Sequence, residues 1–264
     1  MDVWSQSIVL GVVQGLTEFL PVSSSGHLVL LQHFLGFKGN NLLFDLLVHM
    51  ATLLAVVVYF WRDLMALARS LMDGEAREDR RLLFYIGVAT VVTGTIGLAF
   101  KDTLETLFYS PRLVVFTLAV TGLVLFLADR LSHGEKSMYG FGWFSSALVG
   151  LAQGVAIVPG ISRSGSTVSA ALLLGMDREQ AGRFSFLIAI PAIAGAFVLE
   201  VKGVKSLPHT ALGPYLAGMV AAFLVGLASI KVFLKAITSQ RLTWFAYYCW
   251  GVALVSLLLF VGGY

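Results

Sequence analysis

The sequence has few charged residues and a single cysteine. Asp, Glu, Lys and Arg make up 12% of its 264 residues, and 58% are hydrophobic, whereas an ordinary soluble domain carries roughly 25% charged residues. Cys249 can form no internal disulfide, and its apolar surroundings indicate a small core residue. The scarcity of charge excludes an ordinary soluble domain. It predicts an all-α polytopic membrane protein, with one integral membrane domain over residues 1–264.

The beginning of the chain, MDVWSQSIVL, lacks basic residues and a small-residue cleavage site. We therefore expect no removable signal peptide. Apolar runs between charged or turn-rich breaks predict six transmembrane helices, since several runs approach the ~20 residues that a spanning helix needs. The predicted spans are residues 42–62, 82–100, 112–130, 184–201, 214–234 and 242–262.

Two further apolar regions, 5–36 and 144–176, are interrupted near their middles by small polar residues. Backbone groups left unpaired against lipid are costly, so such breaks are tolerated only where protein or a water-filled cavity surrounds them. We predict that both regions are re-entrant helical hairpins, each entering and leaving the membrane on one face.

The two interrupted regions also match each other, and other segments match in the same order. The matched ranges are 14–26 with 153–165, 44–55 with 184–195, and 112–116 with 241–245. Each unit, 1–130 and 131–264, would hold one hairpin and three spans. Three spans leave the chain on the opposite side of the membrane, so the second unit would start there and insert with inverted topology. This pattern predicts an inverted-topology repeat with a polar site between its halves.

Basic residues are distributed unevenly between the two sides of this predicted topology. The side that holds the loops 62–81, 130–143, 177–183 and 235–241 carries twelve Lys and Arg residues, against five on the other side. By the positive-inside rule the richer side is cytoplasmic, and both termini lie outside. Segment 65–81 is expected to be a solvated or interfacial cytoplasmic arm.

Each polar break carries residues that suit anion binding. In the first, Gln14 and Glu18 share one helical face, and Ser23, Ser24 and Ser25 are good N-caps for a second limb. In the second, a Pro-Gly pair ends one limb and residues 162–167 open the next. Helix N-termini with free amides and hydroxyls are anion sites.

Three ionisable residues narrow the chemistry. Arg163 is expected at membrane depth, where a cation needs a partner, and its planar fork suits phosphate oxygens. Glu18 could bind a divalent cation or accept a proton, and His27 could transfer protons near neutral pH. One interpretation is a structural Arg163–Glu18 ion pair with the serines as caps. The combination of acid, histidine, arginine and serines favours the other, an anion-handling site.

These residues resemble the signature motifs of a known family. EFLPVSSSGH (18–27), preceded by Gln14, and PGISRSGST (159–167) are similar to the two motifs of the undecaprenyl-pyrophosphate phosphatase family, the BacA/UppP type linked to bacitracin resistance. The resemblance extends over the whole chain and includes FSFLIAIPA (184–192). That family carries Glu or Gln at the position of Gln14, so no charged role is expected there.

The resemblance implies hydrolysis of undecaprenyl pyrophosphate to undecaprenyl phosphate, the lipid carrier for peptidoglycan, at the outer face of the bacterial inner membrane. It implies a divalent cation, Mg²⁺ or Ca²⁺, with Glu18 as its ligand. The expected partners are this lipid and other membrane lipids, with a homodimer as a candidate assembly and no nucleic acid.

The expected mechanism assigns a role to each motif residue. The catalytic candidates are Glu18, Ser24, His27 and Arg163, and the substrate-binding candidates are Gln14, Ser23, Ser25, Ser162, Ser164 and Thr167. Ser24 is the candidate nucleophile, with direct attack by water as the alternative. Asp45 and His49, which share a helical face, are expected to be satisfied polar contacts beside the site.

Inverted repeats with broken helices also occur in transporters, so a flippase of a prenyl-phosphate lipid is the alternative function. A lipid-binding scaffold without turnover is a third hypothesis. Phosphate release in detergent micelles separates the first two, because a micelle has no two sides between which to transport.

Overall fold

In the computed structural model, residues 1–37, 41–107, 110–201, 212–239 and 241–263 are described, and they form helices without a β-strand. The elements are α1 (Val3–Thr17), α2 (Ser24–Leu35), α3 (Asn41–Tyr59), α4 (Trp61–Ser70), α5 (Arg77–Ala99), α6 (Lys101–Leu107), α7 (Pro111–Leu131), a 3₁₀ turn (Met138–Gly140), α8 (Trp143–Val155), α9 (Arg163–Leu173), α10 (Arg178–Glu200), α11 (Leu212–Thr238) and α12 (Leu242–Val261).

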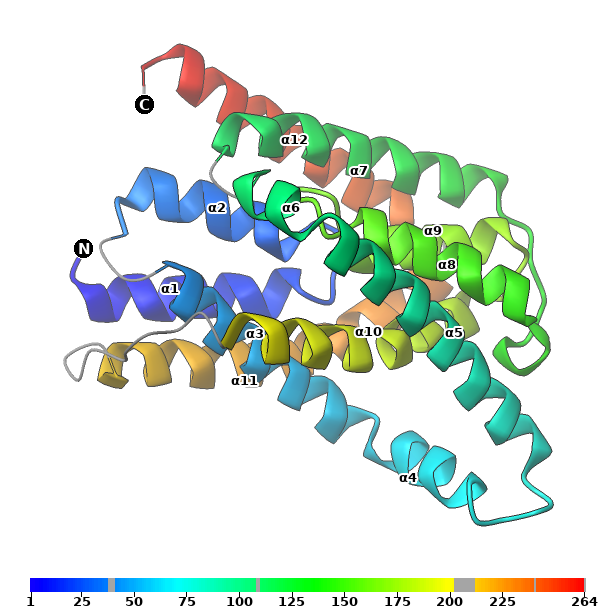
Figure 1. The fold of residues 1–264 in the computed structure, drawn as a ribbon. Helices are drawn as coiled ribbons and strands as arrows, with labels where there is room; N and C mark the ends of the chain where they lie inside the picture. The colour runs from blue at the N-terminus through cyan, green and yellow to red at the C-terminus, as the bar shows by residue number, and fades with distance from the viewer. Residues whose placement is uncertain (38–40, 108–109, 202–211, 240, 264) are drawn as a thin grey trace.

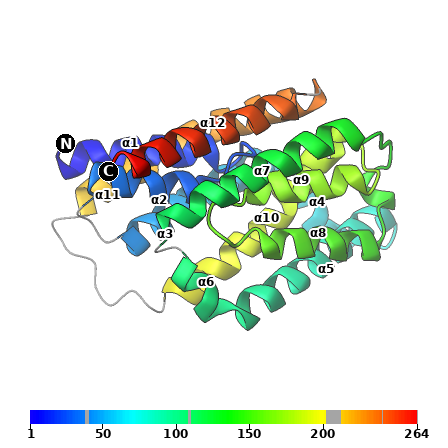
Figure 2. The ribbon, with the colours of Figure 1, turned by 90° about the horizontal axis from the view of Figure 1, so that it is seen from above.

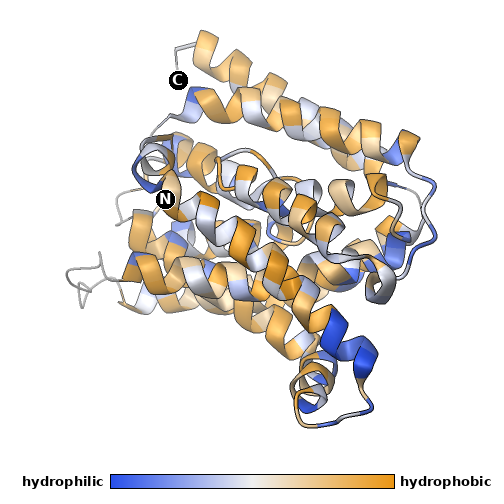
Figure 3. Ribbon diagram, turned by 45° about the vertical axis from the view of Figure 1, so that its right-hand side comes forward, coloured by the Kyte–Doolittle hydropathy of each residue, from blue (hydrophilic) through white to orange (hydrophobic). Residues whose placement is uncertain are grey.

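Six of these helices, α3, α5, α7, α10, α11 and α12, are long and apolar enough to cross a membrane. Their most apolar windows have mean hydropathies of 1.8 to 2.2. Figure 3 shows hydrophobic helices with polar segments gathered near their ends, above all at the turn between α4 and α5. The prediction of an all-α protein with six helices able to span a membrane is therefore confirmed.

Two helices, α5 and α10, start several residues earlier than the hydropathy predicted. Helix α10 begins at Arg178 because the Asp177 side chain accepts hydrogen bonds from the amides of Glu179 (2.9 Å) and Gln180 (3.2 Å). The predicted arm 65–81 is not one element. Its first part belongs to α4, and its last residues are the charged first turns of α5.

The two polar breaks interrupt helices as predicted. Helices α1, α2, α8 and α9 have only 11 to 15 residues each, or about 16–22 Å at 1.5 Å per residue, against a hydrocarbon core of ~30 Å. Each pair is joined by a short turn, which we call the first elbow (residues 18–23) and the second elbow (residues 156–162).

The elbows lie inside a layered bundle. In two views, α9 and α8 lie between α7 and α5 (Figures 1 and 2), and α12 runs along α7. Helix α1 packs along α11, which also contacts α3. Both termini lie on one side of the molecule, and the α4–α5 turn lies on the opposite side (Figure 1).

Glycines allow α1 to pack closely on α11. A Cβ atom on Gly11 would lie 2.1 Å from the carbonyl oxygen of Gly218, and one on Gly15 would lie 2.6 Å from the carbonyl oxygen of Ala222. Small residues at helix contacts of this kind let backbones approach within a membrane. The α1–α11 contact therefore fixes the first elbow relative to the rest of the bundle.

We predict that Gly11→Ala lowers stability by ~1–3 kcal/mol, because its methyl group would overlap backbone atoms of α11. The thermal unfolding midpoint in detergent should fall by several degrees. Gly94→Ala on α5 is the matched control, since a Cβ there meets nothing within 4 Å. Equal midpoints for the two variants would contradict the close α1–α11 contact.

Candidate active site

The first elbow is anchored by aromatic packing and contains a strained serine. Phe19 is fully buried, and its ring lies edge-on to that of Phe186 on α10, with centroids 5.6 Å apart. Ser23 has φ of +67°, the left-handed region that non-glycine residues rarely adopt. Its side chain caps α2 by accepting a hydrogen bond from the Gly26 amide at 3.3 Å. Such strain persists where surrounding contacts determine it, often at functional sites.

Helix α7 holds the second elbow through two threonines. Thr117 donates to the carbonyl oxygen of Pro159 (2.7 Å) and Thr121 to that of Gly160 (2.9 Å). Gly160 has φ of +89°, and a Cβ there would lie 1.9 Å from the Thr117 hydroxyl, so only glycine fits. Ser162 then caps α9, its hydroxyl accepting from the Gly165 amide at 3.0 Å.

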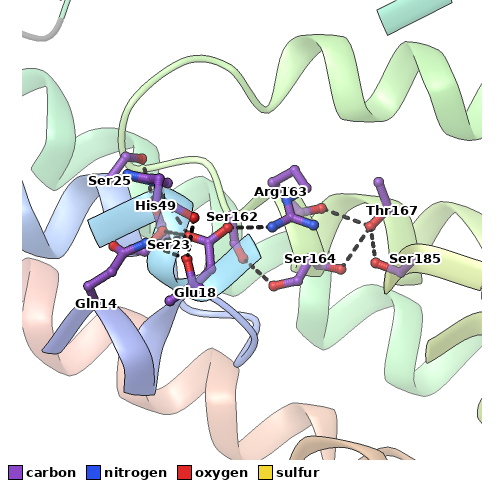
Figure 4. Close-up of polar contacts among 12 residues, drawn as sticks. Gln14, Glu18, Ser23, Ser25, His49, Ser162, Arg163, Ser164, Thr167 and Ser185 are labelled. Carbon is purple, nitrogen blue, oxygen red and sulfur yellow. Dashed lines mark hydrogen bonds and ion pairs between the residues drawn. The ribbon is translucent and has the colours of Figure 1, made fainter. Parts of the chain in front are cut away.

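The two elbows meet at an ion pair. The Arg163 guanidinium at the start of α9 binds Glu18 Oε1 in the first elbow through Nη2 (Figure 4). The Ser164 hydroxyl adds a second connection by donating to the Leu20 carbonyl oxygen at 3.0 Å. The ion pair that one interpretation of the sequence predicted is therefore present, and it lies beside the candidate nucleophile.

Glu18 is the centre of this polar cluster and is almost fully buried. Its second oxygen, Oε2, accepts hydrogen bonds from the Ser24 hydroxyl (2.5 Å) and the Gln14 amide nitrogen (3.1 Å). His49 Nε2 on α3 lies 3.5 Å from the same oxygen. Three predicted residues thus converge on Glu18, together with a histidine that was expected beside the site.

His27 lies apart from the Ser24–Glu18 pair. Its Nδ1 is 2.7 Å from the Ser23 carbonyl oxygen, and its Nε2 is 2.9 Å from the Tyr248 hydroxyl on α12. Neither contact is with Ser24, whose hydroxyl donates to Glu18. The immediate proton acceptor for Ser24 in this arrangement is therefore the carboxylate.

The remaining predicted substrate-binding hydroxyls contact protein groups. Ser25 and Ser23 lie 3.3 Å apart, as do Ser162 and Ser164, and Thr167 lies 2.5 Å from Ser185 on α10. Figure 4 shows these residues on both sides of the Glu18–Arg163 pair. These hydroxyls lie at or near the N-termini of α2 and α9, and Ser23 and Ser162 cap them, so both N-termini are ordered without a bound anion.

Two buried polar atoms in the cluster have no hydrogen-bond partner. They are Nη1 of Arg163 and Oε1 of Gln14, a side chain that is fully buried. An unpaired buried polar atom costs free energy, and this cost is removed when a ligand binds it. The guanidinium nitrogen can donate to an anion, and the amide oxygen can bind a cation.

The described residues contain no group of three or more His, Cys, Asp or Glu side chains arranged for a metal ion. The cluster offers one carboxylate, Glu18, and the unpaired oxygen of Gln14. Mg²⁺ is often held by one or two carboxylates, with substrate phosphates and waters completing its shell. The residues therefore fit a cation that arrives with a phosphorylated substrate.

Sequence reasoning underestimated some contacts and missed others. Asp45 and His49 were expected to be satisfied polar contacts beside the site. Asp45 is one, since its Oδ1 accepts a hydrogen bond from Gln32 at 2.6 Å, whereas His49 Nε2 lies 3.5 Å from Glu18 Oε2 itself. Nothing in the sequence pointed to Tyr248, which is 221 residues from His27. Thr117 and Thr121 read as ordinary residues of a spanning helix, and their contacts depend on the packing of α7 against α9.

Comparison with known proteins agrees with the motifs. Residues 7–255 match the family described as Bacitracin resistance protein BacA. The chain is 44% identical over 262 residues to the undecaprenyl-diphosphatase of Carboxydothermus hydrogenoformans, covering 98% of each chain. It is 46% identical over 247 residues to the undecaprenyl-diphosphatase of Syntrophotalea carbinolica, covering 92% of this chain and 94% of the relative. The chain therefore belongs to the BacA bacitracin resistance protein family.

Proposed function

We infer that the chain is an undecaprenyl-diphosphatase, which hydrolyses undecaprenyl pyrophosphate to undecaprenyl phosphate and inorganic phosphate. One structural observation carries this function: the Ser24–Glu18–Arg163 cluster, where the elbows bring two helix N-termini together inside an apolar bundle. The cluster joins a nucleophile, a proton acceptor and an anion-binding cation. The apolar helices around it suit a substrate whose other half is a prenyl chain.

Arg163 and the helix N-termini would hold the pyrophosphate. The unpaired Nη1 of Arg163 can donate to a phosphate oxygen while Nη2 remains on Glu18. Charge-assisted hydrogen bonds from a guanidinium are among the strongest available in proteins. Because charge spreads over the phosphoryl oxygens during transfer, the same contact would stabilise the transition state.

Ser24 would attack the terminal phosphorus, and its proton would pass to Glu18 Oε2 along the existing 2.5 Å hydrogen bond. The new bond joins Ser24 Oγ to phosphorus, and the anhydride P–O bond breaks, releasing undecaprenyl phosphate. Water would then attack the phosphoserine and give a proton to His27, while Glu18 returns its proton to Ser24 Oγ as the P–O bond breaks and phosphate leaves. In the alternative route, water attacks directly and Ser24 only binds phosphate.

We propose Glu18, assisted by Gln14 Oε1, as the protein ligand of a divalent cation. Formal charge favours this, because Glu18 and Arg163 cancel each other and leave the substrate's negative charge unbalanced. Once bound, such a cation would supply Lewis-acid stabilisation of phosphate oxygens. Mg²⁺ and Ca²⁺ both prefer oxygen ligands of this kind.

We also propose that the chain is an inverted repeat of units 1–130 and 131–264, with α1–α2 and α8–α9 as re-entrant hairpins. Corresponding glycines support this, since 139 residues separate Gly11 from Gly150. Gly11 packs on α11, the second span of the second unit, and Gly150 packs on the Ala89 carbonyl of α5, the second span of the first. The repeat would lie among inner-membrane lipids, with a homodimer as the candidate assembly and the active site open to the periplasm.

The alternative function is a flippase of a prenyl-phosphate lipid, which the same repeat could support. Phosphate release by purified protein in detergent micelles decides between the two. Arg163→Ala should reduce this release at least ~100-fold, because it removes the cation that faces the phosphates. Arg163→Lys should restore only part of this release, since the lysine ammonium lacks the planar set of N–H donors that a guanidinium presents to phosphate oxygens.

Removing Arg163 also leaves the Glu18 carboxylate buried without its partner, so each variant's unfolding midpoint is measured beside its activity. Arg62→Ala on the exposed face of α4 is the control and should resemble wild type. A folded Arg163→Ala protein with wild-type turnover would exclude the site assignment. No phosphate release from the wild type would favour the flippase.

Glu18→Gln should lose most activity, because the amide can neither accept the Ser24 proton nor balance a cation's charge. Gln14→Glu should be tolerated, since the family motif carries either residue. Excess chelator should silence the wild-type enzyme in the same phosphate-release assay, and added Mg²⁺ or Ca²⁺ should restore it. Full activity under chelation would remove the cation role and leave Glu18 as a base alone.

The proposed orientation predicts which introduced cysteines are accessible from outside. In a Cys249→Ala background, Thr103→Cys on α6 should react with an impermeant thiol reagent in intact cells, whereas Glu75→Cys should react only after the membrane is opened. Both side chains are exposed. Each variant must keep its phosphatase activity for its labelling to count. The opposite pattern would show that the first elbow opens to the cytoplasm.

A further inference from the structure

Tyr248 brings the C-terminal helix into contact with the active-site histidine. Its hydroxyl lies 2.9 Å from His27 Nε2, and the two rings stack with centroids 5.6 Å apart and planes 8° from parallel. His27 is buried, whereas Tyr248 is 46% exposed. The buried imidazole is therefore in contact with a phenol that is itself partly exposed.

The hydrogen bonds of His27 identify its reactive nitrogen. Nδ1 lies 2.7 Å from the Ser23 carbonyl oxygen, which can only accept, so Nδ1 carries a proton. The neutral ring then has its lone pair on Nε2 and accepts a hydrogen bond from the Tyr248 hydroxyl. When His27 gains a proton, Nε2 donates to the phenolic oxygen instead. His27 therefore gains and loses its proton at Nε2, the nitrogen that is hydrogen-bonded to the Tyr248 hydroxyl.

The segment of α12 around Tyr248 is itself fixed. Cys249 is fully buried, and its sulfur lies 3.9 Å from the Pro21 carbonyl oxygen of the first elbow. The Trp250 indole donates to the Ala119 carbonyl oxygen on α7 at 3.0 Å. The two residues that follow Tyr248 are thus tied to the elbow and to its neighbouring helix, which gives the phenol a defined place beside His27.

We propose that Tyr248 is a positioning residue that sets the orientation of the His27 ring for its acid/base step. This proposal rests on the phosphatase function inferred above. The Ser23 bond fixes the tautomer, and the Tyr248 bond with the stacked ring fixes the rotation of the imidazole. Small displacements of a catalytic group can cost ~100-fold in rate, so a group that only orients the ring matters to turnover.

Tyr248→Phe removes the hydroxyl and keeps the ring. We expect kcat for phosphate release to fall about tenfold, part of the ~10²–10⁴ that general acid–base catalysis supplies, with KM within about twofold of wild type. The pH at which activity is half-maximal should also shift, which loss of packing alone would not cause. Tyr247→Phe is the matched control, because Tyr247 is equally exposed and packs on Phe126 and Trp250.

A second readout does not depend on turnover. Diethyl pyrocarbonate acylates an unprotonated imidazole nitrogen, and mass spectrometry of the peptide containing His27 gives its rate. Tyr248→Phe should label His27 several-fold faster than wild type and Tyr247→Phe should not, with exposed His133 as the internal reference. An unchanged kcat and pH profile in Tyr248→Phe, or equal labelling of His27 in both variants, would overturn the positioning role.

The outcomes separate this proposal from the function on which it rests. If the wild type releases phosphate and Tyr248→Phe matches it in kcat, KM and pH profile, the phosphatase assignment stands and the positioning role fails. If the wild type releases no phosphate, the function fails, and an unchanged labelling rate would further show that Tyr248 does not shield His27 Nε2.

Discussion

The ion pair between Glu18 and Arg163 is the interaction on which the rest of the site depends. It joins the two elbows across a sequence separation of 145 residues. Both side chains are largely buried, so removing one partner would leave an uncompensated charge, at a cost of ~3–5 kcal/mol. Ser24, Gln14 and His49 are arranged around the second oxygen of the same carboxylate. The Ser164–Leu20 hydrogen bond joins the same two segments, so the elbows contact each other through backbone as well as through the pair.

The pair leaves capacity for a ligand. Arg163 uses Nη2 for Glu18 and keeps Nη1 unpaired, so phosphate can bind without the pair first breaking. The elbows that hold it are closely constrained by their own caps and neighbours: the Ser23 hydroxyl accepts from the Gly26 amide, and Gly160 is closed in by Thr117. A preorganised site does not have to reorder its dipoles when charge develops on the phosphoryl group, which is how such sites accelerate transfer.

Hydropathy and helix capping are local properties of the chain, and they predicted the six spans and the two helix breaks. The cluster of Glu18, Ser24 and Arg163 was predicted differently, from the two motifs and from the need of a buried cation for a partner. Contacts between distant helices are not local. Tyr248 reads as one aromatic residue among many in an apolar run, and only the packing of α12 beside the first elbow brings it to His27. Likewise, His49 could be placed on a helical face, but not 3.5 Å from Glu18.

The two histidines near the site share one arrangement with different consequences. In each, Nδ1 contacts the carbonyl oxygen four residues earlier, that of Ser23 for His27 and that of Asp45 for His49. This local bond fixes the tautomer and leaves Nε2 to face another helix or the elbow. His49 directs it toward Glu18, and His27 directs it toward Tyr248. In the proposed mechanism the Ser24 proton would pass to Glu18, so His27 would serve the later step, in which water attacks the phosphoserine.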